Sequence, residues 1–168
     1  DRILLKPGKL TPEEFEIMKT HTTLGRDAII AAETGTTQDN PFFRYAKEIA
    51  YSHQEKWDGS GYPEGLVGNT IPLSARLMAV ADVYDALISE RVYKSAYTHE
   101  QAVEIIRDGR GSHFDPDMVD AFLALSEDFR RIAQEFADAE PARLAEVDRL
   151  AADLPIERIE LTSRDEPL

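Results

Sequence analysis

Two histidines and one aspartate are the side chains of this 168-residue chain best suited to bind a metal ion. His21 and His53 each lie among apolar residues at helical spacing, so both imidazoles are expected to point inward. Asp82 lies in an apolar run, where a carboxylate without a partner is very costly. Imidazole and carboxylate ligands suit divalent ions such as Fe, Mn, Ni or Zn. Histidines that only complete a hydrophobic core fit the same spacing, so at this point both interpretations stay open.

A glycine-rich loop follows His53. The stretch 58–63, Asp-Gly-Ser-Gly-Tyr-Pro, holds several turn formers and ends in proline, so it cannot be helical. A short segment that carries Glu55 and Trp57 joins it to His53. A helix that ends at a candidate ligand and opens into a rigid loop is a common way to build a binding site.

Helices are expected to position these groups, and the predicted fold class is all-α with no internal repeat. The apolar periodicity predicts helices over residues 12–32, 41–53, 74–89, 98–108 and 116–136, and a weaker one after 140. Capping boxes are expected at Thr11 with Glu14 and at Thr98 with Gln101. The third helix is expected to be buried on most sides. The residues expected to share a buried face with the histidines are Ile17, Leu24 and Ala28 in the first helix and Phe42, Tyr45 and Ile49 in the second.

Composition excludes several classes of protein. The chain has no cysteine, so disulfides and thiolate zinc sites are ruled out. Its net charge of −13 argues against binding to nucleic acid, which needs clustered cations. No apolar run is long enough to span a membrane, and the first residues lack the apolar region of a secretory signal. The expected location is the cytoplasm.

The segment 53–63, HQEKWDGSGYP, resembles the signature of the HD-GYP domain family, HHExxDGxGYP. The resemblance covers about residues 1 to 125. The family is an all-helical branch of the HD superfamily of metal-dependent phosphohydrolases, and its typical activity is hydrolysis of cyclic di-GMP to linear pGpG or on to GMP. Further matching segments are Lys6-Pro7-Gly8, Gly65-Leu66, Ile71-Pro72, Ala75-Arg76, the run from Ala81 to Leu87, Arg91-Val92-Tyr93-Lys94 and His113-Phe114-Asp115-Pro116.

The resemblance assigns roles to individual residues. It implies an HD-domain-like helical bundle that holds two divalent metal ions and binds cyclic di-GMP. The implied metal ligands and catalytic residues are His21, His53 and Asp82, with Gln54 as a further candidate ligand. The implied substrate-binding residues are Arg91 and Lys94, which would contact phosphates, and Gly61, Tyr62 and Pro63 of the loop that names the family.

The chain departs from the family pattern in two places. The histidine–aspartate pair of an HDxGK segment is absent, and family spacing would put it shortly before Asp1. Residues 1–137 are therefore expected to be the C-terminal part of an HD-GYP domain without its N-terminal helices, and residues 138–168 an acidic helical tail or linker. Gln54 stands where many members have a second histidine, and an amide oxygen is the weaker ligand.

Two functions from different classes fit these observations. The first is a cyclic di-GMP phosphodiesterase, and the second is a degenerate HD-GYP module that binds nucleotide or a GGDEF-domain protein without catalysis. A hydrolase of another cyclic dinucleotide is a third. A receiver or other sensor domain is the expected upstream partner. The two remaining histidines are expected to be structural, His99 exposed after a helix cap and His113 within a loop.

Overall fold

The structure is a computed structural model that describes residues 3, 6, 8–33, 40–89 and 96–137. The chain divides into two compact units, Asp1–Asp128 and Phe129–Leu168. Arg91, Lys94 and the predicted tail 138–168 lie outside the described residues, so their predicted roles and the predicted boundary at 137/138 stay predictions.

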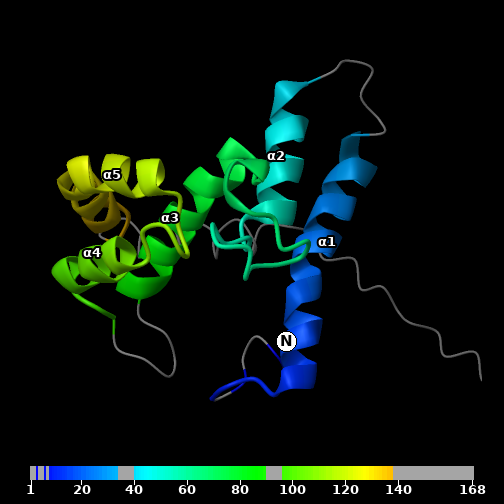
Figure 1. The fold of residues 1–168 in the computed structure, drawn as a ribbon, viewed down its shortest axis with the longest axis horizontal. Coiled ribbons are helices and arrows are strands. Elements are labelled where there is room, and N and C mark those ends of the chain that lie inside the picture. Colours follow the sequence, from blue (N-terminus) through cyan, green and yellow to red (C-terminus); the bar gives the residue numbers. More distant parts are fainter. Residues whose placement is uncertain (1–2, 4–5, 7, 34–39, 90–95, 138–168) are drawn as a thin grey trace, which may run out of the picture. The chain divides into compact units, whose positions relative to one another are not determined.

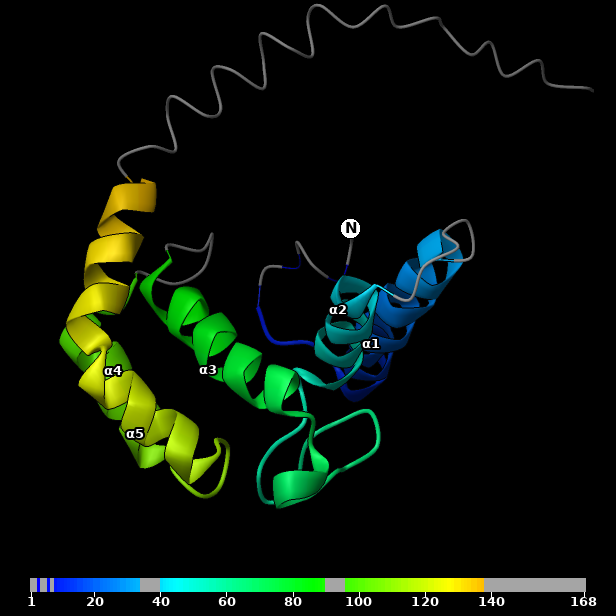
Figure 2. The ribbon, with the colours of Figure 1, turned by 90° about the horizontal axis from the view of Figure 1, so that it is seen from above.

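Helices make up the first unit, and the described ranges contain no β-strand, which confirms the predicted all-α class. Helices α1 and α2 lie side by side, and α3 runs from this pair towards α4 and α5 (Figures 1 and 2). After a break, residues 126–137 are helical as well. The elements are α1 Pro12–Glu33, α2 Pro41–Ser52, the short 3-10 helix η1 Gly68–Thr70, α3 Leu73–Ile88, α4 His99–Asp108 and α5 Pro116–Ala124.

The helix starts follow the predicted capping chemistry. The Thr11 N–H donates to the Glu14 carboxylate at 2.7 Å, and the Glu14 N–H donates back to the Thr11 hydroxyl at 3.3 Å. Thr98 and Gln101 form the same reciprocal pair at the start of α4. Such boxes satisfy N–H groups that a helix end leaves without partners.

The hydrophobic core gathers where α3, α4 and α5 meet. A buried side of α3, with Ala79, Val80 and Tyr84, packs towards the other two helices. Ile106 of α4 and Val119 of α5 are fully buried. α3 also lies against α2, where the Ser74 hydroxyl donates to the Glu48 carboxylate at 2.5 Å.

The side of α1 that faces inward is shifted by one residue from the predicted one. Ile17 and Leu24 were expected to be buried but are 57% and 64% exposed, and His21 is exposed too. Thr22 is buried instead, and a Cβ added to Gly25 would lie 3.6 Å from the Ala50 Cβ. Small residues let two helix backbones approach, so this side meets α2 although the neighbouring side is more apolar. On α2, Phe42 was also expected to be buried but is 67% exposed.

Two further expectations about the helices are wrong. α3 is not buried on most sides, since Leu77 and Met78 are 63% and 37% exposed. The helix predicted to run unbroken to 136 stops at Leu125, whose φ of −112° and ψ of 12° are not helical. The apolar residues keep their helical spacing across Leu125, so the sequence pattern does not show that the helix ends there. Along the described ranges no helix has both the length and the apolar character needed to cross a membrane.

Candidate active site

Two of the predicted metal ligands meet between α1 and the end of α2. The Nε2 atoms of His21 and His53 lie 3.2 Å apart, and their ring centroids are 5.2 Å apart. His21 projects from α1, while His53 is the residue that caps the C-terminus of α2. The close packing of the two helices therefore brings together imidazoles that are 32 residues apart in the chain.

Backbone carbonyls fix the tautomer of both rings. The His21 Nδ1 lies 2.6 Å from the Met18 carbonyl, and the His53 Nδ1 lies 2.9 Å from the Ile49 carbonyl. A carbonyl can only accept, so each Nδ1 must carry the proton. In the neutral rings both Nε2 atoms then present lone pairs to one another. A cation bound between them would accept both lone pairs.

The pair fits a divalent metal ion. Two nitrogens each about 2.1 Å from one ion would lie about 3.0 Å apart at an angle of 90° and about 3.4 Å apart at the tetrahedral angle. The observed separation of 3.2 Å lies within this range. Histidine ligands of metals commonly donate the other ring N–H to a carbonyl, as both rings do here. Among the described residues, however, no group of three or more His, Cys, Asp or Glu side chains is placed to share one ion.

Asp82, the third predicted ligand, lies on α3 and is half-buried. Burial raises the pKa of the Tyr62 hydroxyl, and the negative charge of Asp82 raises it further. Asp82 is therefore close enough to act electrostatically on the loop beside the histidines, although it does not join them in one ligand group.

The loop predicted to line the site packs against the segment that follows His53. A Cβ on Gly61 would lie 2.3 Å from the Lys56 nitrogen, so only glycine fits there. The Tyr62 N–H donates to the backbone carbonyl of Gln54 at 3.1 Å. Pro63 follows Tyr62 through a cis peptide bond and is half-buried.

Tyr62 itself lies beside the histidine pair. Its ring meets the His21 ring edge to face, with 6.3 Å between the centroids, and the Phe15 ring at 5.9 Å. Tyr62 thus connects the loop to α1. The contact between the loop and the histidine pair is that of Tyr62 with His21, and the role of Gly61, Tyr62 and Pro63 as a wall of the site stays a prediction.

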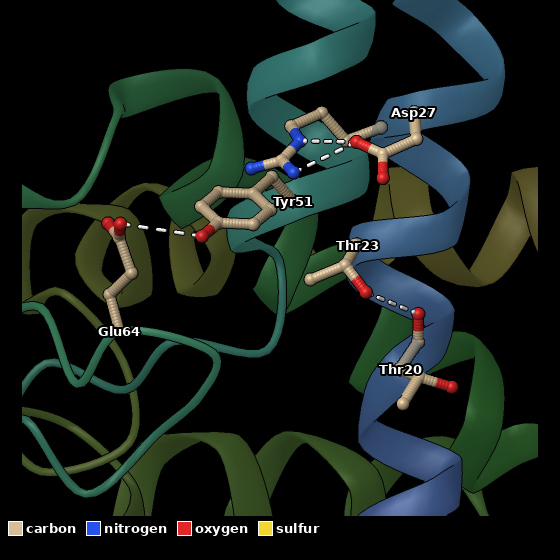
Figure 3. Close-up of polar contacts among 6 residues, drawn as sticks. Thr20, Thr23, Asp27, Tyr51 and Glu64 are labelled. Atoms are coloured by element: carbon tan, nitrogen blue, oxygen red, sulfur yellow. Dashed lines mark hydrogen bonds and ion pairs between the residues drawn. The ribbon is translucent and has the colours of Figure 1, made fainter.

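A second set of contacts joins α1, α2 and the loop (Figure 3). The Arg26 guanidinium lies 4.2 Å from the centre of the Tyr51 ring and is held by Asp27 at 2.8 Å. The Tyr51 hydroxyl donates to the Glu64 carboxylate at 3.4 Å. Sequence reasoning missed this bridge, because a tyrosine on a helix gives no sign of which loop it will meet. On α1 nearby, Thr23 donates to the Thr20 carbonyl at 2.9 Å.

The other two histidines do not join the site. His99 was expected to be exposed, but its side chain is only 10% exposed and its Nδ1 lies 2.8 Å from the Tyr84 hydroxyl. Tyr84 is a buried core residue with a polar end, which explains why it takes a partner from α4. His113 stacks on Phe114, and burial lowers the pKa of its imidazole. The His113 carbonyl accepts the Trp57 N–H at 3.1 Å, in keeping with the structural role predicted for His113.

A match to a family model identifies the class of this helical domain. The family model described as "HD domain" matches residues 1–118, and the chain belongs to that family. The resemblance predicted from the sequence is thereby confirmed.

Three relatives illustrate the likeness. A Vibrio cholerae serotype O1 protein named "Probable cyclic di-GMP phosphodiesterase" is 60% identical over 84% of this chain and 32% of its own length. The "Cyclic di-GMP phosphodiesterase response regulator RpfG" of Xanthomonas campestris pv. campestris is 45% identical over 83% of this chain and 35% of its own length. The "3'3'-cGAMP-specific phosphodiesterase 2" of Vibrio cholerae serotype O1 is 42% identical over 82% of this chain and 25% of its own length. The chain thus spans about a third or less of these relatives.

Proposed function

We propose that this chain is part of a metal-dependent phosphodiesterase that hydrolyses cyclic di-GMP to pGpG, GMP or both in bacterial signalling. The observation that carries the proposal is the pair of Nε2 atoms 3.2 Å apart, with both Nδ1 atoms committed to carbonyls. The names of relatives at 60% and 45% identity support the substrate.

The metal centre would draw on residues of three helices. His21 and His53 would share one ion, and Asp82, with Gln54 as a further candidate, would contribute further ligands to a site for two ions. Metal dependence is general among HD-domain phosphohydrolases. Fe, Mn, Ni and Zn all suit such ligands. When bound, divalent ions supply a Lewis acid that neutralises phosphodiester charge and activates water.

The remaining residues would bind and orient the substrate. A tyrosine hydroxyl is protonated at neutral pH, and burial raises the pKa of Tyr62 further, so this hydroxyl can donate to a phosphate oxygen. We assign the predicted phosphate contacts to Arg91 and Lys94, since a guanidinium can hold two phosphate oxygens at once. Gly61 and Pro63 would keep the loop close to the histidines.

Partners follow from the same proposal. Cyclic di-GMP is the proposed ligand, and GGDEF-domain proteins are candidate partners of the loop. The words "response regulator" in one relative's name support an attached receiver domain in the intact protein. The expected cytoplasmic location stays a prediction.

A second substrate has specific support. The relative at 42% identity is named for 3'3'-cGAMP, which shares one guanosine and both phosphodiester bonds with cyclic di-GMP. The histidine pair would serve either cyclic dinucleotide. The higher identity to the relative named for cyclic di-GMP, 60%, favours the first substrate.

The test uses the intact protein loaded with Mn²⁺. Its hydrolysis of cyclic di-GMP and of 3'3'-cGAMP is measured separately, together with bound metal. His53→Ala should lose metal and activity together, whereas His113→Ala, outside the site, should keep its metal. Full activity of His53→Ala with unchanged metal would contradict the proposed site, and absence of turnover in the wild type with metal bound would favour the degenerate binding module.

A further inference from the structure

We propose that Glu55 is a positioning residue that holds the loop 58–66 so that Tyr62 stays beside the histidine pair. The proposal rests on the proposed function, because it assigns a consequence for substrate binding to that loop. Glu55 is neither a proposed metal ligand nor a proposed phosphate contact, because it acts on the site only through the loop.

Both oxygens of the Glu55 carboxylate are used by the same loop. Oε1 accepts the N–H of Glu64 at 2.8 Å, and Oε2 accepts the N–H of Leu66 at 3.0 Å. Glu55 is only 2% exposed, so water cannot replace these bonds easily. Hydrogen bonds to a carboxylate are stronger than those between neutral groups, and a buried carboxylate needs them.

The backbone around Glu55 holds the other end of the loop. The Tyr62 N–H donates to the Gln54 carbonyl at 3.1 Å. A Cβ on Gly61 would lie 2.5 Å from the Glu55 Cα, so the two chain segments are in direct contact. The loop is therefore held at Tyr62 by the Gln54 carbonyl and, two and four residues later, at Glu64 and Leu66 by the Glu55 side chain.

This arrangement links the position of Tyr62 to that of His53. Glu55 follows His53 by two residues, and the Glu55 N–H donates to the Ser52 carbonyl at the end of α2 at 3.0 Å. The turn that begins at His53 thus also carries the carboxylate that holds the loop. If the loop were released, Tyr62 could leave its position 6.3 Å from the His21 ring without any change in the two histidines.

A double-mutant cycle in the intact protein separates this role from a general contribution to stability. Glu55→Gln keeps the shape of the side chain but replaces one acceptor oxygen with an N–H₂ group, which cannot accept the loop N–H. We expect the KM for cyclic di-GMP to rise about tenfold with bound metal unchanged. In a Tyr62→Ala background the same substitution should leave KM unchanged, because Glu55 acts through Tyr62.

Glu48→Gln is the matched control. Glu48 lies on α2, is partly buried and accepts the Ser74 hydroxyl at 2.5 Å, which a glutamine oxygen can also do. The KM of the Glu48→Gln variant for cyclic di-GMP should stay at the wild-type value. An unchanged KM in Glu55→Gln, or an equal rise with and without Tyr62, would overturn the proposal.

A measurement without substrate distinguishes failure of this inference from failure of the proposed function. In Glu55→Gln we expect amide hydrogen exchange at Glu64 and Leu66 to be faster by about tenfold or more, and the nuclear Overhauser contact between the Tyr62 and His21 rings to weaken. If the wild type does not hydrolyse cyclic di-GMP, the proposed function fails while exchange still tests the loop contact. Unchanged exchange and an unchanged ring contact would refute the role of Glu55. If Glu55→Gln does not fold, Glu55→Asp, whose carboxylate is one methylene further from the loop, gives the same tests.

Discussion

The Arg76 guanidinium and the Asp115 carboxylate form a nearly buried ion pair, with 2.7 Å between Nη1 and Oδ2. Arg76 projects from the first half of α3, and Asp115 is the residue that caps α5. The other oxygen of Asp115 accepts the N–H of Asp117 at 2.8 Å, so one carboxylate both caps α5 and joins it to α3. The Arg76 Nη1 also donates to the Asn69 Oδ1 at 3.0 Å, but Asn69 is neutral, so Asp115 supplies the negative charge that offsets this guanidinium.

Asp115→Ala should therefore destabilise the domain by about 3–5 kcal/mol, because it leaves a buried guanidinium uncompensated and removes a helix cap. Urea unfolding of the intact protein, followed by circular dichroism, gives the free energy of unfolding. Asp120→Ala is the control. It breaks an exposed pair with Arg110, also at 2.8 Å, and should change stability little. If both substitutions lowered the free energy of unfolding equally, the claim that burial makes the pair of Asp115 with Arg76 more important than the exposed pair would be contradicted.

Gly61→Ala should displace the loop and impair substrate binding, since the new Cβ would meet backbone atoms of Gln54, Glu55 and Lys56 at 2.3–2.6 Å. The expected result is a large rise in KM for cyclic di-GMP with bound metal retained. Gly25→Ala is the matched control. Its Cβ would make an ordinary 3.6 Å contact with Ala50, and alanine within a helix is more stable than glycine by about 0.5–1 kcal/mol. A tolerated Gly61→Ala would refute the close packing described for the loop.

The lowered pKa of His113 predicts how stability depends on pH. Burial is the main cause, with the charge of Lys56 adding to it and that of Asp58 opposing it. Because the unfolded state takes up the proton first, stability should fall as pH drops from about 6.5 towards the folded pKa, and stay constant above that window as far as His113 is concerned. Nuclear magnetic resonance titration of the ring should show the lowered value. His113→Gln should flatten this part of the pH profile, and an unchanged profile would contradict the assignment.

Sequence patterns predicted the helix starts and the glycine-rich loop because both depend on short-range spacing. Capping boxes at Thr11 and Thr98 and the loop around Gly61 need only a few neighbouring residues. The meeting of His21 with His53 followed from a resemblance that carries three-dimensional information. The proximity of these two histidines could therefore be predicted, but the side-chain contacts around them could not.

What could not be predicted depends on partners far along the chain. Helical periodicity does not tell which side of α1 will pack against α2. The side with the small residues Thr22 and Gly25 faces α2, and the more apolar side does not. Glu55 meets N–H groups nine and eleven residues away, through a loop whose shape no periodicity specifies. His99 was expected to be exposed because its partner Tyr84 lies fifteen residues away on another helix.

The most direct test of the account is ¹⁵N nuclear magnetic resonance of the imidazoles in the intact protein during titration with Zn²⁺. The account predicts that the Nε2 signals of His21 and His53 shift together on metal binding, while both Nδ1 atoms keep the protons that they donate to Met18 and Ile49. The signals of His99 and His113 should not follow them. Binding through Nδ1, or Zn²⁺ uptake that leaves both Nε2 signals unchanged, would contradict the claim that these two histidines form the metal site.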